Sequence, residues 1–260
     1  MMKILLYQVD AFTGRVFRGN PAAVCPLEEW LDEELMQAIA AENNLPETAF
    51  FVLETEGYRI RWFTPEAEVD LCGHATLASA FVLFNYIDNT LTRVTFNSKS
   101  GPLTVASDGE LLSMDFPSQP AKPCPTPREL IEGLGREPIE VLRSEDYLAV
   151  LAGENEVAKL EPDMGSLKKL ELRGVIVTAE GEDADFVSRF FAPKSGIDED
   201  PVTGSSHCSL IPYWSAKLGK QKLHALQVSQ RGGELFCEDR GDRVLISGRV
   251  VKFMEGFISL

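Results

Sequence analysis

Three short stretches of the sequence carry residue types that move protons or hold anions. ENNLPETAFF (42–51) places Glu47 just after a helical pattern and just before an apolar strand pattern. We expect such a carboxylate to be partly desolvated, which raises its pKa toward that of a working general base. VDLCGHATLASA (69–80) and GIDEDPVTGSSH (196–207) place a thiol, glycines, histidines and acids ahead of apolar segments. This combination suits proton transfer on a small anion.

Gly73 and Gly204 stand where two apolar helices are expected to begin. The first N–H groups of a helix have no partner within it, and the helix dipole favours negative charge there. Glycine has no side chain to block an approaching ligand, and Ser205 follows the second glycine. Either glycine alone is explained by a tight turn. Two of them at matching helix starts predict two cradles for a small carboxylate, converging on one cleft if the halves face each other.

The acidic run Asp198, Glu199 and Asp200 lies beside the second glycine. Taken alone, this run is typical of a loop or a helix cap, and Glu47 of a solvated acid. Their combination with paired glycines favours a catalytic role. A metal site is not expected, because the three histidines and five cysteines form no HxxxH, HxH or CxxC spacing.

The composition excludes several other classes of function. The net charge is −15 and the Lys and Arg residues are scattered, which argues against nucleic acid as a partner. The longest apolar run, ATLASAFVLF, is too short to span a bilayer, so no membrane role is expected. The start of the chain lacks an export signal, and an odd number of cysteines fits reduced thiols. We therefore expect a cytoplasmic protein.

The sequence also repeats itself. RWFTPEAEVDLCGHAT (61–76) aligns with RFFAPKSGIDEDPVTGSSH (189–207) when three residues are inserted, and SKSGPLTVASDGELL (98–112) parallels QRGGELFCEDRGDRV (230–244). The matched landmarks are Arg61 with Arg189, Phe63 with Phe191, Pro65 with Pro193, Gly73 with Gly204 and His74 with Ser205. A chance recurrence of strand–helix–strand patterns is the alternative to an internal duplication.

Within each half, short strand patterns surround one helix that is apolar nearly all round, and such a helix must be enclosed by protein. We expect an α+β fold in which a sheet wraps around a central helix, twice.

PSQPAKPCPTP (117–127) contains five prolines and predicts a linker. The predicted domains are 1–116 and 128–249, and a C-terminal strand at about 250–260 is a candidate to complete the first of them. Helices are expected at 31–44 and 74–86. Strands are expected at 3–9, 21–25, 49–53, 58–63, 93–96, 102–105 and 111–116.

The motifs NLPETAF, LCGHATLA and DEDPVTGSSHC, with FTGRVFRGNPAAV near the start, closely resemble the PhzF-like family, named for the phenazine biosynthesis isomerase. The resemblance spans essentially the whole chain. It implies the fold of diaminopimelate epimerase and proline racemase, with two similar barrel-like, mostly antiparallel domains and an active site between them. It implies Glu47 as the proton shuttle and His74 and Asp200 as supporting acid–base residues. Gly73 and Ser205 match substrate-binding positions. It also implies no cofactor and a homodimer.

We therefore expect a cofactor-independent isomerase that moves a proton on a small carboxylate-bearing substrate through an enol- or diene-type rearrangement. The related racemases use two cysteines, one at each helix start. Cys72 occupies the first such position but Thr203 the second, which disfavours a two-thiol racemase. Cys72 and Cys208 are expected to be packing residues. An epimerase or racemase with unlike bases and a non-catalytic ligand- or protein-binding role stay open as alternatives.

Overall fold

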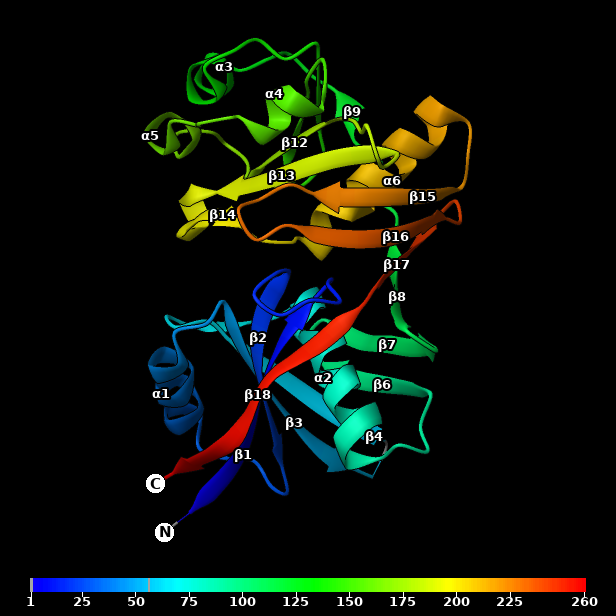
Figure 1. The fold of residues 1–260 in the computed structure, drawn as a ribbon. Coiled ribbons are helices and arrows are strands. Elements are labelled where there is room, and N and C mark those ends of the chain that lie inside the picture. Colours follow the sequence, from blue (N-terminus) through cyan, green and yellow to red (C-terminus); the bar gives the residue numbers. More distant parts are fainter. Residues whose placement is uncertain (1, 56) are drawn as a thin grey trace. The chain divides into compact units, whose positions relative to one another are not determined.

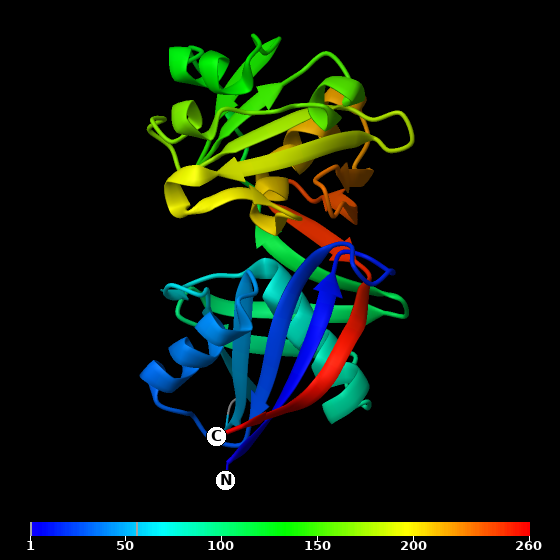
Figure 2. The same cartoon turned by 60° about the vertical axis from the view of Figure 1, so that its left-hand side comes forward.

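The computed structural model describes residues 2–55 and 57–260, which divide into two compact units (Figures 1 and 2). The first unit comprises Met1–Asp115 and Ser247–Leu260, and the second comprises Phe116–Ile246. The C-terminal segment thus returns to the unit in which the chain begins, where the backbones of Met2 and Leu260 hydrogen-bond each other at 3.0 Å. Within the described ranges, no helix is long and apolar enough to cross a membrane.

The first unit is mostly antiparallel sheet. Its strands are β1 (Lys3–Ala11), β2 (Asn20–Leu27), β3 (Glu47–Glu54), β4 (Gly57–Phe63), β5 (Glu68–Val69), β6 (Arg93–Ser98), β7 (Gly101–Asp108), β8 (Leu111–Pro117) and β18 (Val250–Ser259). The β18–β1–β2 and β3–β4–β5 pairings are antiparallel, as is β6–β7–β8. The β2–β3 and β4–β6 pairings are parallel. All seven strands expected in this half are present.

Helix α2 (Gly73–Val82) lies at the centre of this unit, packed against β1, β2, β3, β7 and β18 (Figure 1). Its side chains are buried on nearly every face, so the expectation of a sheet around a central helix is confirmed. Thr76 and Ser79 satisfy their hydroxyls by donating to the carbonyls of Cys72 and Ala75, one turn back. Helix α1 (Glu33–Asn43) packs outside, against β3 and β4.

The second unit contains one long helix, α6 (Gly204–Leu218), and several short ones. Its strands are β9 (Lys122–Pro123), β10 (Glu140–Arg143), β11 (Tyr147–Val150), β12 (Val175–Glu180), β13 (Phe186–Ala192), β14 (Ile197–Asp200), β15 (Lys222–Gln227), β16 (Gly233–Asp239) and β17 (Arg243–Gly248). The short helices are α3 (Arg128–Leu134), α4 (Glu154–Ala158), α5 (Met164–Leu167) and the 3₁₀ turn η2 (Pro193–Ser195). Helix α6 packs against β15 and β16.

The two units repeat one pairing order. The β10–β11 pairing is antiparallel, β11–β12 is parallel, and β12–β13–β14 is antiparallel, as in β1–β2, β2–β3 and β3–β4–β5. The β13–β15 pairing is then parallel and β15–β16 antiparallel, as in β4–β6 and β6–β7. In both units the long buried helix follows the short strand, β5 or β14. The repeated sequence landmarks therefore correspond to a repeated arrangement of strands.

The structure differs from the sequence expectations at a few boundaries. The central helix expected at 74–86 is α-helical to Val82 and continues as the π-helical turn η1 (Leu83–Ile87), whose end is closed by Asp88 N–H donating to Leu83 O. Strand β5 was not expected, because a strand of two residues is too short to show the alternation of apolar and polar residues that marks a strand in a sequence. The proline-rich stretch 117–127 is counted with the second unit, and Lys122–Pro123 pairs with β10 as an edge strand.

Candidate active site

Glu47 is positioned by the turn between α1 and β3. Helix α1 ends where Asn44 adopts the left-handed conformation, with φ 50° and its N–H donating to Ala40 O. Asparagine tolerates that conformation well, and Pro46 then favours extended backbone, so β3 begins at Glu47. Asn43 Nδ2 donates to Thr48 Oγ1 at 3.1 Å and ties the helix end to the strand. The carboxylate is thus fixed at the first position of a buried strand.

His74 is the second residue of α2, and its ring contacts the Glu47 carboxylate. Nε2 of His74 lies 3.2 Å from Oε2 of Glu47, with the two side chains 7% and 13% exposed. Burial lowers the pKa of His74 to about 4, although a hydrogen bond to the Pro21 backbone carbonyl opposes the shift. The imidazole is therefore neutral near pH 7. The structure brings together two of the residues that the sequence analysis proposed for acid–base chemistry.

Cys72 lies on the other side of the same imidazole. Its Sγ is 3.5 Å from Nδ1 of His74, and the residue is buried, as expected for a packing cysteine. One ligand atom each of Glu47, Cys72 and His74 lie within 4.8 Å of one another. The sequence analysis missed this grouping of three metal-ligating side chains. Glu47 comes from β3 and the other two from the start of α2, so no short spacing reveals it.

In the second unit, Asp200 ends β14 and contacts the residue that precedes α6. Thr203 Oγ1 donates to Asp200 Oδ2 at 2.5 Å. The buried side chain of Gln227 accepts from Thr203 N–H at 2.9 Å and donates to Asp200 O at 2.8 Å. The amide of Gln227 thereby fixes the loop that leads into the helix. Sequence reasoning did not identify Gln227, which has no neighbouring chemical motif.

Ser205 lies beside a cation that the sequence analysis also missed. Arg173 Nη2 donates to Ser205 Oγ at 3.3 Å, and the same guanidinium makes two hydrogen bonds to Asp146, at 3.1 and 2.7 Å. The hydrogen bonds to Asp146 raise the pKa of Arg173, so the charge is permanent. At Gly204, an added Cβ would meet no atom within 4 Å. The start of α6 is therefore open at its first residue and has a positive charge nearby.

The three acids expected near the second glycine have different environments. Glu199 makes a two-point ion pair with Arg189 at 2.7 and 2.8 Å, and Asp198 is exposed. The first unit contains the same ion pair between Arg61 and Glu68, at the same two distances. Both arginines stack over a phenylalanine ring two residues further along. Glu199 is thus a structural residue, and only Asp200 of the three contacts the start of α6.

The remaining histidines and thiols are placed away from these two helix starts or are buried in packing. His207 is fully buried in α6, with Nδ1 2.8 Å from Thr203 O, and His224 pairs with Glu234 at 2.9 Å. Cys208 is buried in α6, as expected, and burial raises its pKa to about 12. A thiol with such a pKa is a poor base or nucleophile at neutral pH.

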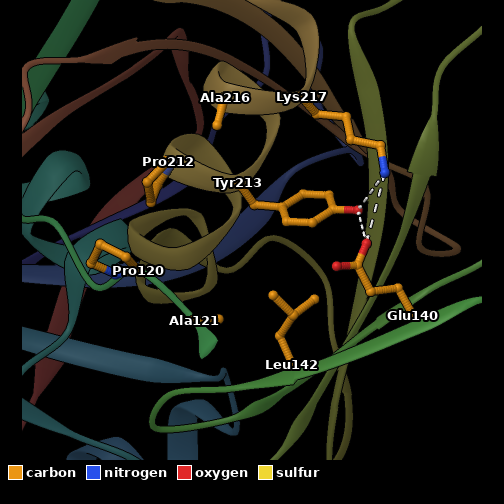
Figure 3. Close-up of a pocket in the computed structure, with 8 residues that line it drawn as sticks. All are labelled: Pro120, Ala121, Glu140, Leu142, Pro212, Tyr213, Ala216 and Lys217. Carbon is orange, nitrogen blue, oxygen red and sulfur yellow. Dashed lines mark hydrogen bonds and ion pairs between the residues drawn. The ribbon is translucent and has the colours of Figure 1, made fainter. Parts of the chain in front are cut away.

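A separate pocket of about 390 Å³ in the second unit is lined by residues of α6 and β10 and by Pro120 and Ala121 (Figure 3). Tyr213 and Lys217 of α6 point toward Glu140 of β10, and Tyr213 OH donates to the Glu140 carboxylate at 2.8 Å. Burial and this carboxylate raise the pKa of Tyr213 above its usual range. No residue proposed for the active site lines this pocket. Its polar groups already satisfy one another.

Comparison with known proteins agrees with this architecture. The family model described as "Phenazine biosynthesis-like protein" matches residues 9–256. An uncharacterized isomerase of Pseudomonas aeruginosa is 52% identical, covering the full length of both chains. The crystal structure of a phenazine biosynthesis protein of the PhzF family from Enterococcus faecalis is 51% identical over 100% of both chains, with a TM-score of 0.98.

More distant structures share the fold. A probable proline racemase from Agrobacterium radiobacter has a TM-score of 0.64 at 12% identity, covering 99% of this chain and 93% of its own. This likeness confirms the fold expected from the sequence motifs. The family match over residues 9–256 and the relatives above 50% identity lead to one conclusion: the chain belongs to the phenazine biosynthesis-like (PhzF) family.

Proposed function

We propose that this protein is an isomerase that moves a proton between two carbon atoms of a small carboxylate-bearing substrate without a cofactor, with Glu47 as the group that takes and returns the proton. One observation carries the proposal: the Glu47 carboxylate and the neutral imidazole of His74 lie 3.2 Å apart in a largely buried setting. The names of three bacterial relatives, which call them uncharacterized isomerases, support the reaction class.

The chemistry follows from the properties of the two groups. Glu47 removes a proton from a carbon conjugated with the substrate carboxylate, and the electron pair moves into an enol- or dienol-type system. Return of the proton at a different carbon completes the isomerisation. In the tautomer whose Nδ1 carries the hydrogen, Nε2 of His74 accepts the new O–H of Glu47 and holds the proton between the two steps. Its low pKa keeps the ring from capturing the proton itself.

The developing negative charge needs fixed partners. We assign this task to the backbone N–H groups at the helix starts by Gly73, Gly204 and Ser205, because oriented amides stabilise an oxyanion without reorganising. Asp200 is assigned a supporting part in proton relay through its hydrogen bond with Thr203. The roles of these second-unit residues rest on the family motif and on the repeated helix start.

The test is hydrogen exchange in D2O with a panel of small unsaturated and hydroxy- or amino-substituted carboxylates. The purified protein should introduce deuterium into at least one compound and convert it to a positional isomer, as detected by NMR and mass spectrometry. Glu47→Gln should abolish both the label and the isomer. Asp198→Asn, which changes an exposed acid, is the matched control.

The same experiment separates the alternatives. An epimerase or racemase would introduce deuterium at one carbon and invert its configuration without moving a double bond. A binding protein would change the NMR signals of a ligand on binding but would introduce no deuterium into it. A two-thiol mechanism is disfavoured because Thr203, not a cysteine, precedes Gly204, and Cys208 is a buried thiol with a raised pKa.

A further inference from the structure

We propose that Arg173 is a specificity-determining residue: acting through the Ser205 hydroxyl, it makes the start of α6 prefer a carboxylate over a neutral group of the same shape. This inference rests on the proposed function, in which Ser205 helps to hold the substrate anion. It adds a positive charge at that place, in a protein whose net charge is −15. Because Arg173 acts through another residue, it is a positioning residue and not a catalytic one.

The repeated fold gives Arg173 a counterpart in the first unit. Strand β3 begins at Glu47, whose carboxylate lies 3.2 Å from Nε2 of His74, the second residue of α2. The equivalent strand of the second unit is β12, and Arg173 lies two residues before it. The guanidinium donates to Ser205, the second residue of α6, at 3.3 Å. Each unit thus brings a charged side chain from the start of the same strand to the second position of the helix, and the two charges have opposite signs.

The guanidinium of Arg173 is held in place by several contacts. It makes two hydrogen bonds to Asp146, at 3.1 and 2.7 Å, and the Asp146 side chain is only 4% exposed. Its central carbon lies 5.5 Å from the centroid of the Phe190 ring. At Gly174, the next residue, an added Cβ would lie 2.7 Å from the same ring, so glycine lets the backbone pass close to β13. A buried two-point partner and an aromatic ring therefore fix the direction in which the guanidinium donates.

The contact with Arg173 leaves the half-buried Ser205 hydroxyl as a donor. A serine hydroxyl has one hydrogen and two lone pairs. Nη2 of Arg173 donates to one lone pair, and in the described part of the chain the hydroxyl itself donates to no protein acceptor. Its hydrogen is therefore available to a ligand, and the cation behind the oxygen strengthens it as a donor. Because hydrogen bonds to charged acceptors are stronger than those to neutral ones, a carboxylate gains more from this hydroxyl than an amide does.

Arg173 also offsets a negative charge near the start of α6. Asp200 ends β14, and its carboxylate accepts a hydrogen bond from Thr203, the residue before the helix. This carboxylate would repel an anion bound at Ser205. Hydrogen bonding to Asp146, with a smaller effect from the charge of Asp200, raises the pKa of Arg173, so the guanidinium stays charged and opposes that repulsion.

The experiment uses crotonate and crotonamide, two probes of one shape that differ in charge. Binding to the native protein is followed by NMR through the backbone amide signals of Gly204 and Ser205, and crotonate should bind at least about tenfold more tightly than crotonamide. Arg173→Gln should weaken crotonate binding about 10- to 100-fold, as expected for a lost charge-assisted interaction, and should leave crotonamide binding within about twofold. Arg143→Gln is the matched control, because Arg143 is an ion-paired arginine of the same unit with the same exposed fraction, 43%.

Two further variants guard against misfolding, because Arg173→Gln leaves the buried carboxylate of Asp146 without its partner. The double variant Arg173→Gln/Asp146→Asn removes both charges and should also lose the preference for crotonate, whereas Arg173→Lys keeps the charge and should retain most of it. Thermal melting identifies unfolded variants. Native affinity for crotonate in the folded variants, an equal loss for crotonamide, or no preference for crotonate at the two amides of the native protein would overturn the role of Arg173.

The binding experiment does not depend on catalysis, which is tested by D2O exchange with Glu47→Gln. A charge preference that requires Arg173, without exchange on any substrate, would support this inference and contradict the proposed function. With a substrate found by exchange, Arg173→Gln should raise KM about 10- to 100-fold and leave kcat within about threefold, as expected for lost binding rather than lost chemistry. A fall in kcat at unchanged KM would overturn the assignment of Arg173 to specificity.

Discussion

The starts of α2 and α6 occupy equivalent places in two units that repeat one strand order, yet their side chains differ in kind. The start of α2 gathers a carboxylate, an imidazole and a thiol within 4.8 Å. The start of α6 has hydroxyls, one carboxylate, a fixed amide and an arginine: Thr203, Ser205, Asp200, Gln227 and Arg173. The first set suits proton transfer and the second suits holding an anion.

Under the proposed function, the two repeated units have different tasks: the first transfers the proton and the second helps to hold the anion. The ion pairs Arg61–Glu68 and Arg189–Glu199 occur in both units, where each joins the short strand before the helix to the neighbouring strand. The residue after the first helical glycine is His74 in one copy and Ser205 in the other. The ion-paired residues are thus equivalent in the two units, whereas the residues proposed to contact a ligand are not.

The largest effect should come from the base. Glu47→Gln keeps size and shape but removes proton acceptance, so turnover should fall about 10²–10⁴-fold while ligand affinity changes little. Asp200→Asn should have the smaller effect, because Asp200 is assigned only a supporting part. Steady-state rates and D2O exchange measure both. If Asp200→Asn is the more damaging change, the catalytic division between the units is reversed.

The two buried histidines should give each unit a matching acid sensitivity. Burial holds the pKa of His74 and His207 at about 4 in the folded state, against about 6.5 when unfolded. The unfolded chain therefore binds more protons between these values, and stability falls as the pH falls from 6.5 to 4, by about 3 kcal/mol for each histidine. Denaturant unfolding across this range measures the slope.

Substitutions of the two histidines should differ in their effect on kcat. His207→Gln should flatten the pH dependence of stability but leave kcat within about tenfold of the native value, because the His207 ring contacts the Thr203 carbonyl, the Ser206 hydroxyl and the Phe186 ring and none of the residues assigned to proton transfer. His74→Gln should flatten it too, but should lower kcat. Equal loss of activity in both would show that the second histidine belongs to the reaction.

The repeated ion pairs should matter for stability rather than catalysis. Hydrogen bonds from Arg61 lower the pKa of Glu68 to about 2, so its stabilising effect is present above about pH 4.5 and is lost as the pH falls toward 2. Glu68→Gln and Glu199→Gln should each lower the free energy of unfolding by about 1.5–3 kcal/mol. Thermal melting at pH 7 compares them, and markedly unequal losses would mean that the pairs are not equivalent.

Blocking the helix starts should weaken ligand binding. Gly204→Val places a branched side chain where an added Cβ has open space, so the fold should survive while anion approach is obstructed. A helix end contributes about 0.3–1 kcal/mol, or up to about 2 when partly buried, which corresponds to about 2- to 30-fold in affinity. Gly73→Val tests the other helix. Calorimetric titration that gives native affinity in both variants would contradict the carboxylate cradles.

The smallest effect is expected at the thiol. Cys72→Ser should retain turnover within about tenfold, since the sulfur is assigned to packing and Glu47 to the proton. A racemase that used Cys72 as its base would give the opposite pattern, with Cys72→Ser inactive and Glu47→Gln active. Rates for the two variants, measured on one preparation checked for folding, distinguish these mechanisms.

The sequence by itself determined the repeated fold and the family. Strand patterns rich in β-branched and aromatic residues, one helix apolar nearly all round and two aligned Arg–Phe–Pro–Gly series predicted the repeated sheet-and-helix arrangement, because residue preferences and burial patterns are local properties of the chain. The family was identified by motif resemblance. Glu47, His74 and Asp200 were identified by the same resemblance. The sequence also showed that the second unit has no thiol at the start of its helix, because Thr203 stands at that position.

Only the tertiary structure decided which of these groups meet. The pairing of Glu47 with His74, the approach of Cys72, and the positions of Gln227 and Arg173 join residues from separate strands, loops and helices. No periodicity encodes such contacts, since they depend on how the strands register around each helix. For the same reason, Glu199 could be separated from Asp200 only in the folded chain: its partner, Arg189, lies on the neighbouring strand.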